Sequence, residues 1–167
     1  DALALLDHLD LRRAAILGWS DGAITGLHLA LHHPARTERL YALAANADAT
    51  GLAPDPARQP AYAAYLARTR EEYRRLAPEP AAWPATRAAL GRMWQSEPRF
   101  TAAELARLSV PVRLAAGDHD EVIRAPHTRA LARAIPRASL RFFAGLGHFA
   151  MLQDPPRFTD DVRHFLA

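Results

Sequence analysis

Residues of three kinds that together carry out nucleophilic catalysis each follow a short apolar run in this chain. Ser20 comes after the first run, Asp118 and Asp120 after the third and His148 after the fourth. A serine hydroxyl becomes a strong nucleophile when an imidazole takes its proton, and a carboxylate orients and stabilises that imidazole. The residue types and their order along the chain therefore favour acyl-transfer chemistry.

The serine lies in a motif that predicts an exposed nucleophile. Residues 18–22 read Gly-Trp-Ser-Asp-Gly, between an apolar run at 14–19 and apolar residues at helical spacing over 23–31. A sharp strand-to-helix turn of this kind projects the serine hydroxyl at the carboxyl end of a sheet. We expect both glycines to be required, because strand and helix pass close together there. The N–H of Asp21, at the helix start, is expected to face an oxyanion.

Four apolar runs predict the strands of one sheet, at residues 14–19, 39–45, 110–117 and 138–144. The first two runs and the helix expected between them span about 30 residues, which indicates a βαβ unit with parallel strands. Further helices are expected at residues 1–9, 126–135 and 155–167. The fold class is therefore α/β, a parallel sheet of about four strands with flanking helices.

The middle of the chain predicts a helical insertion. Prolines interrupt it, and helices are expected at residues 62–76, 85–94 and 101–108, the last with Thr101 and Glu104 as a capping box. Glu71 and Arg75 form an i,i+4 pair. A helical block between two strands of one parallel sheet is expected to act as a lid.

This gives three segments: residues 1–50 with the serine, the lid at 51–109, and 110–167 with the acid and the histidine. We expect the lid aromatics mostly to pack, with one or two lining a pocket; they are Tyr62, Tyr65, Tyr73, Trp83 and Trp94.

Composition excludes several classes of protein. Apolar residues make up 50% of the 167 residues, which is typical of a globular chain. The absence of cysteine excludes disulfides and thiolate metal sites. All 21 basic residues are arginines scattered among 18 acids, so the net charge of +3 does not predict nucleic-acid binding. No apolar run approaches the roughly 20 residues of a membrane span. We expect a cytoplasmic protein without nucleic-acid or membrane partners.

Two clusters have residue types that bind metals. His28 and His32 are four apart on one predicted helix, and residues 118–121 read Asp-His-Asp-Glu. The two histidines lack a nearby carboxylate and are expected to be solvated. The side chains of four consecutive residues diverge, so we expect no metal there either, and no cofactor.

The sequence resembles the α/β-hydrolase superfamily over its whole length. Among its members, the valacyclovir hydrolase-like (biphenyl hydrolase-like) serine hydrolases are the most similar. The segments that carry the resemblance are Gly-Trp-Ser-Asp-Gly-Ala-Ile-Thr-Gly (18–26), Ala-Ala-Asn-Ala-Asp (44–48), Gly-Asp-His-Asp-Glu (117–121) and Gly-His-Phe-Ala-Met-Leu-Gln-Asp-Pro (147–155).

The resemblance implies a triad of Ser20 as nucleophile, His148 as base and Asp120 as acid. Asp120 is preferred over Asp118 because the family pattern is Gly-x-x-Asp. It further implies hydrolysis of small carboxylic esters through an acyl-enzyme, with the N–H of Asp21 as an oxyanion donor. The carboxylate of Asp21 either binds a cationic substrate, such as an amino-acid ester, or is a helix acid stabilised by the dipole.

Other functions remain open. A perhydrolase or a C–C hydrolase could use the same triad, and a non-catalytic or truncated, inactive member of the fold is a third reading. Dehalogenases and epoxide hydrolases of this superfamily use an aspartate where Ser20 stands, and are disfavoured.

The resemblance begins partway into the family pattern. The early strands and the loop that gives the second oxyanion N–H have no counterpart, so only part of the α/β-hydrolase fold is expected. Residues 14–19 would then form a sheet edge with unpaired backbone groups. We expect self-association through this edge.

Overall fold

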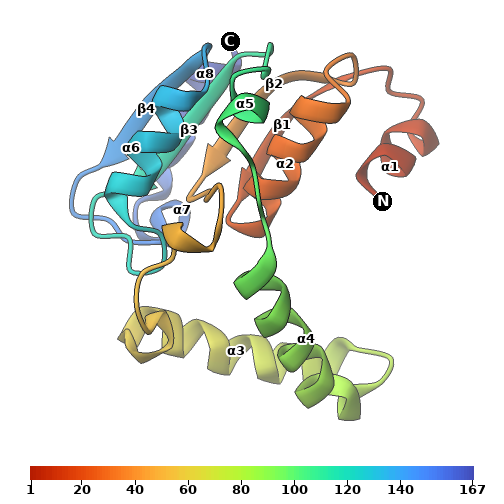
Figure 1. Ribbon diagram of the computed structural model, residues 1–167. Coiled ribbons are helices and arrows are strands. Elements are labelled where there is room, and N and C mark those ends of the chain that lie inside the picture. Colours follow the sequence, from red (N-terminus) through yellow and green to blue (C-terminus); the bar gives the residue numbers. More distant parts are fainter.

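The structure, a computed structural model that describes all 167 residues, contains one parallel sheet (Figure 1). Its strands have the order β1-β2-β3-β4, and each pairs in parallel with the next. They are β1 (Ala14–Trp19), β2 (Thr37–Leu43), β3 (Val112–Gly117) and β4 (Ala138–Phe143). The predicted α/β class is confirmed. The second strand ends two residues earlier than expected, and Ala44 then has a φ of 57°.

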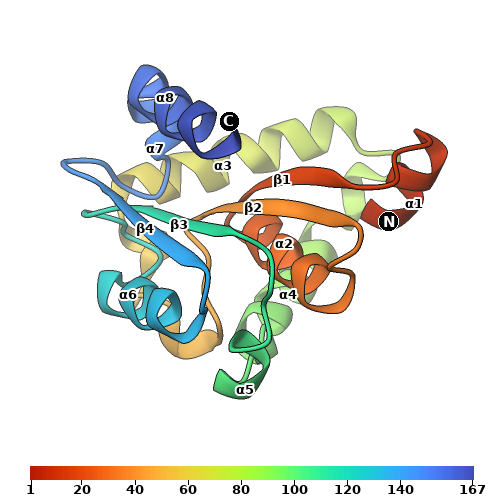
Figure 2. The same ribbon diagram turned by 90° about the horizontal axis from the view of Figure 1, so that it is seen from above.

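Helices cover both faces of the sheet (Figure 2). One face carries α2 (Asp21–His32), α5 (Ala102–Leu105) and α6 (Ala125–Ala134), and the other carries α8 (Pro155–Leu166). The short helix α7 (Ala150–Gln153) precedes α8, and α1 (Ala2–His8) lies beside the β1 edge. No helix combines the length and the apolar character needed to cross a membrane.

Each face of the sheet has its own hydrophobic core. Along β2, Leu40 and Ala42 pack under α2, whereas Tyr41 and Leu43 face the α8 side. Successive side chains of a strand point to opposite faces, which explains this alternation. On the α8 side, the Tyr41 hydroxyl donates to Oδ2 of Asp161 at 2.8 Å.

The first strand is a sheet edge, as expected. β1 has β2 as its one neighbour. Leu17 on this strand is 47% exposed, and further exposed leucines lie on and after α1; they are Leu5, Leu9 and Leu11. A row of unpaired N–H and C=O groups beside exposed leucines favours pairing with another chain. Self-association remains a prediction.

Helices fill the segment between β2 and β3. The long ones are α3 (Pro60–Leu76) and α4 (Trp83–Ser96), with short 3-10 turns at Ala49–Gly51, Pro56–Arg58 and Pro80–Ala82. Both long helices lie beyond the carboxyl ends of the strands (Figure 1). The capping box of Thr101 and Glu104 is confirmed. The division at residues 50 and 109, and the role of a lid, stay predictions.

One predicted ion pair is wrong. Glu71 pairs with Arg74 rather than Arg75: the guanidinium reaches both carboxylate oxygens, at 2.6 and 3.0 Å. Residues three and four apart both lie on the same side of a helix, and the two-point contact favours the nearer arginine.

Candidate active site

Ser20 occupies the turn between β1 and α2 in a strained conformation. Its φ is 53° and its ψ is −119°. A residue with a side chain held there costs about 1–3 kcal/mol, so surrounding contacts must impose the conformation. The Ser20 N–H donates to the carbonyl of Leu43 at 2.9 Å, and its own carbonyl accepts from Ala23 and Ile24 at 2.9 and 3.1 Å. Backbone bonds therefore fix the serine on both sides.

The two glycines of the motif are not equivalent. A Cβ added at Gly18 would lie 2.3 Å from the carbonyl oxygen of Gly22, whereas a Cβ at Gly22 would meet nothing within 4 Å. The expectation of a close approach is right for Gly18 and wrong for Gly22. Gly18 faces the first turn of α2, while Gly22 is exposed on that turn.

His148 and Asp120 form a buried pair. Each side chain is 1% exposed, and Nδ1 of His148 lies 3.0 and 3.2 Å from the two carboxylate oxygens. Asp120 Oδ1 also accepts the N–H groups of Val122 and Ile123, at 2.9 and 2.8 Å. This carboxylate is therefore fixed, and it favours the tautomer with the proton on Nδ1. Nε2 is then left free to accept a proton.

The structure places Asp118 elsewhere. Its Oδ1 accepts the N–H of Gly145 at 2.7 Å, and its side chain is 40% exposed. Of the two aspartates after β3, Asp120 is the one that contacts the imidazole of His148.

Ser20, Asp21 and His148 line one cavity of about 210 Å³. The rest of its wall comes from Trp19 and from the helical segment; those residues are Tyr62, Tyr65, Leu66, Thr69, Trp83, Arg87, Leu90 and Trp94. Ser20 Oγ makes no hydrogen bond in the structure, and such contacts often tighten only when substrate binds. A serine hydroxyl and a carboxylate-backed imidazole in one apolar cavity can perform nucleophilic catalysis.

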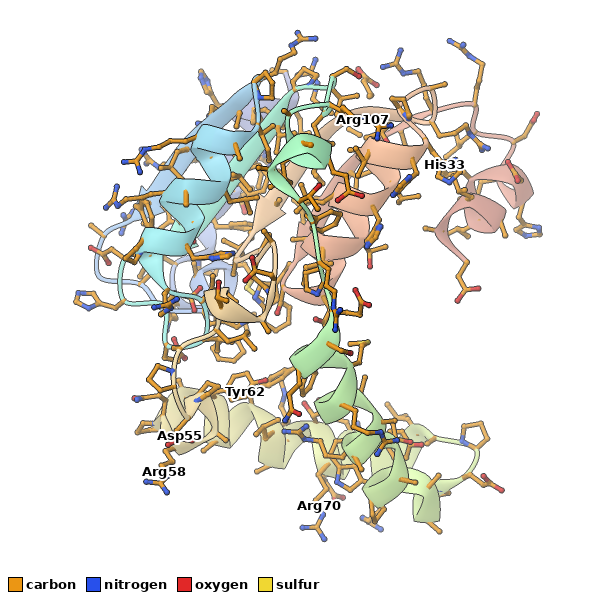
Figure 3. All side chains as sticks on the ribbon, in the orientation of Figure 1. His33, Asp55, Arg58, Tyr62, Arg70 and Arg107 are labelled. Carbon is orange, nitrogen blue, oxygen red and sulfur yellow. The ribbon has the colours of Figure 1, made fainter.

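The aromatic side chains of the helical segment contribute more to the cavity than expected. Tyr62, Tyr65, Trp83 and Trp94 all line it, and of the five only Tyr73 does not, since it packs on Trp83 at 5.2 Å between ring centroids. The sequence holds a signal for this. Residues 62, 65, 66 and 69 have the i, i+3, i+4, i+7 spacing of one helix face. Figure 3 shows Tyr62 on the side of α3 that faces the sheet, with Arg58 and Arg70 pointing away.

The carboxylate of Asp21 has a partner that the sequence did not suggest. The indole N–H of Trp94, on α4, donates to both of its oxygens at 2.9 and 3.2 Å. The guanidinium of Arg87 lies 4.9 Å from the centroid of the Trp94 ring, within the range of a cation–π interaction. The residue after the serine therefore connects the strand-to-helix turn to α4.

Neither metal candidate forms a metal site. No group of three or more His, Asp or Glu side chains is placed to hold a metal ion. His28 and His32 are both exposed, as expected. Their rings stack with centroids 5.7 Å apart, and the ring of His28 also lies 4.6 Å from that of Phe100 in a tilted arrangement.

Residues 1–161 match the model of the alpha/beta hydrolase family. The meta-cleavage product hydrolase of Pseudomonas fluorescens IP01 has a similar structure, with a TM-score of 0.75 and 20% identity over 99% of this chain and 68% of that one. Est816, described as an N-acyl homoserine lactone degrading enzyme, has a TM-score of 0.70 and 26% identity over 99% of this chain and 72% of that one.

Among curated proteins, an uncharacterized protein of Mycobacterium tuberculosis is 36% identical over 58 residues. The match spans 35% of this chain and 17% of the relative's length. The fold shared with the solved structures includes four parallel strands with helices on both faces.

Proposed function

Since the chain belongs to the alpha/beta hydrolase family, we propose that it is a serine hydrolase that acts on carboxylic esters. One observation carries the proposal. A single cavity holds Ser20, in a strained strand-to-helix turn, and His148, whose Nδ1 lies 3.0 Å from Asp120. This combination supplies a nucleophile, a base and the group that orients the base.

In the proposed mechanism, Ser20 Oγ attacks the ester carbonyl carbon while Nε2 of His148 takes its proton. The carbonyl π bond opens to an oxyanion. When the oxyanion collapses, the bond to the alcohol oxygen breaks and His148 returns the proton to the leaving alcohol. Water then attacks the acyl-serine with the same base, which releases the acid and restores Ser20. Asp120 stabilises the imidazolium in both halves.

The start of α2 supports the oxyanion. The first N–H groups of a helix have no partner within the helix, and they carry the positive end of its dipole. The N–H of Asp21 is the first of these after Ser20, and we assign it as one oxyanion donor. Each such donor contributes about 2.7–4 kcal/mol to the transition state.

The ester class has support from one comparison. Est816, at 26% identity, is described as degrading a lactone, which is a cyclic carboxylic ester. The meta-cleavage product hydrolase of Pseudomonas fluorescens IP01 shares 20% identity with this chain, and a likeness at that level supports the fold alone. We therefore do not propose C–C hydrolysis, and the experiment below tests for it as an alternative result.

The charges in the cavity favour uncharged esters over amino-acid esters. The carboxylate of Asp21 is already engaged by Trp94, and Arg87 brings a positive charge to the same cavity. A cationic substrate would have to share this carboxylate with the indole N–H and approach it beside that positive charge. The tyrosines and tryptophans instead present an apolar wall to a small acyl or alcohol group.

The test is a kinetic comparison of two matched ester series that differ only in a free α-amino group. The purified protein should hydrolyse the uncharged series with the higher kcat/KM, and Ser20→Ala should abolish turnover. Asp21→Asn should change both series by the same factor, because its effect passes through Trp94. A selective loss on amino esters would assign Asp21 to a cationic substrate. Turnover that survives Ser20→Ala, or cleavage of C–C substrates without any of esters, would contradict the ester mechanism.

A further inference from the structure

Four consecutive residues of the loop after β3, residues 118–121, contact the loop that carries His148. Beyond the bonds of Asp118 and Asp120 described above, the His119 N–H donates to the carbonyl of Leu146 at 3.0 Å. Glu121 Oε2 accepts the backbone N–H of His148 at 2.8 Å. The segment Asp-His-Asp-Glu therefore holds the histidine loop in place through hydrogen bonds.

The main chain of His148 is held on its other side by Trp19. The indole Nε1–H of Trp19 donates to the carbonyl of His148 at 2.9 Å, and the two ring centroids are 5.4 Å apart. This is the one hydrogen bond between residues 14–22 and residues 144–149. Trp19 directly precedes Ser20, so a single side chain connects the segment of the nucleophile to the segment of the base.

The surroundings of Glu121 are built for its carboxylate. A Cβ added at Gly147 would lie 2.6 Å from Glu121 Oε2, so a larger residue there would require this carboxylate to move. The other oxygen, Oε1, is buried and has no hydrogen-bond partner. A carboxylate oxygen left unpaired in the interior is costly, and a purely structural position would normally avoid it.

We propose that Glu121 and Trp19 are positioning residues that hold the backbone N–H and C=O of His148, so that its imidazole faces Ser20. The inference rests on the proposed function. Ser20 and His148 come from loops after β1 and β4, which β2 and β3 separate in the sheet. Reaction rates depend steeply on such alignment, and a shift of about 1 Å can cost 100-fold.

The test uses a fluorophosphonate probe, whose reaction with serine separates binding (KI) from chemistry (kinact). Trp19→Phe keeps an aromatic ring but removes the pyrrole part of the indole with its N–H. It should lower kinact about 10-fold, and by more than it changes KI. Glu121→Ala should lower kinact about 10- to 100-fold, because it removes a charged hydrogen bond. Glu121→Gln should recover most of this loss, since its amide oxygen accepts the same N–H.

The matched control is Glu38→Gln, at an exposed position on β2; it should react like wild type. Wild-type kinact in either Trp19→Phe or Glu121→Ala would overturn the proposal. Equal impairment of Glu121→Gln and Glu121→Ala would overturn the hydrogen-bond role. Should Glu121→Ala fail to fold, wild-type kinact in Trp19→Phe would still overturn the proposal, and a large loss of kinact in Glu121→Gln would still overturn the hydrogen-bond role.

A second readout separates this proposal from the proposed function. Hydrogen exchange of the His148 amide should accelerate at least 10-fold in Glu121→Ala, while Glu121→Gln stays protected. If wild type fails to react with the probe, the hydrolase function is wrong. Unchanged exchange in Glu121→Ala instead contradicts the contact with Glu121.

Discussion

Replacing Gly18 by alanine tests the geometry of the strand-to-helix turn most sharply. The added Cβ would lie 2.3 Å from the carbonyl oxygen of Gly22, 2.5 Å from its carbonyl carbon and 2.6 Å from the amide nitrogen of Ala23. All three atoms belong to the backbone, so rotation of a side chain cannot relieve the overlap. Strand or helix must move, and Ser20 lies between them.

Such forced shifts cost about 1–3 kcal/mol in well-packed regions. For a chain of 150–250 residues, each kcal/mol lowers Tm by about 2–4 °C. We therefore expect Gly18→Ala to lower Tm by roughly 2–12 °C. Because the displacement lies next to the nucleophile, it should also slow covalent labelling of Ser20.

Gly22→Ala is the matched control, the same chemical change four residues away. Its Cβ would meet nothing within 4 Å. Alanine is favoured over glycine in a helix by about 0.5–1 kcal/mol, so this variant should be at least as stable as wild type. Calorimetry of both proteins measures the difference. Equal Tm values would refute the close approach at Gly18.

Three further predictions concern positions away from the proposed chemistry. His127 Nε2 accepts the N–H of Ala47 at 2.9 Å, and burial lowers the pKa of His127 below its ordinary value of 6.5. As the pH falls, the imidazole is therefore protonated at a higher pH in the unfolded chain than in the folded one. The free energy of unfolding should decrease as the pH drops below about 6.5. Denaturant unfolding from pH 7 to 5 should show this loss in wild type and less of it in His127→Gln, and identical pH slopes would contradict it. Tyr41→Phe should destabilise by about 1.5–3 kcal/mol, because the hydroxyl is buried and bonded to a charged carboxylate; an unchanged urea midpoint would rule this out. The chain should self-associate in light scattering after size exclusion, and Leu17→Lys on the exposed edge strand should shift it toward monomer, whereas a monodisperse wild-type monomer would refute pairing through β1.

The parts of the site that follow from strand topology could be predicted from the sequence. Carboxyl ends of parallel strands meet at one edge, so residues just after apolar runs gather there. This indicates Ser20, His148 and the two aspartates Asp118 and Asp120, and the family pattern Gly-x-x-Asp favours Asp120. The structure pairs Asp120 with His148 at 3.0 Å and places Ser20 in the same cavity as His148. The expectation that both glycines of the motif lie at a close approach of strand and helix is also local, yet it is wrong for Gly22. Which side of the turn faces the strand depends on the direction in which the helix leaves the turn.

Contacts between distant segments could not be predicted. The bond from Trp19 to His148 joins residues 129 apart, and that from Trp94 to Asp21 joins residues 73 apart. Each hydrogen bond depends on how a loop or a helix packs against the sheet. The spacing of residues along the chain does not determine that packing. The sequence marks Glu121 only as one member of the run Asp-His-Asp-Glu, since nothing local shows that its carboxylate reaches a backbone N–H.

The central claim is that Ser20 is an activated nucleophile. Its most direct test is to treat the protein with a fluorophosphonate and measure intact mass, beside Ser20→Ala under the same conditions. If Ser20 is activated, the wild-type chain should carry one covalent adduct and the variant none. An unlabelled wild type, or equal labelling of both proteins, would contradict it.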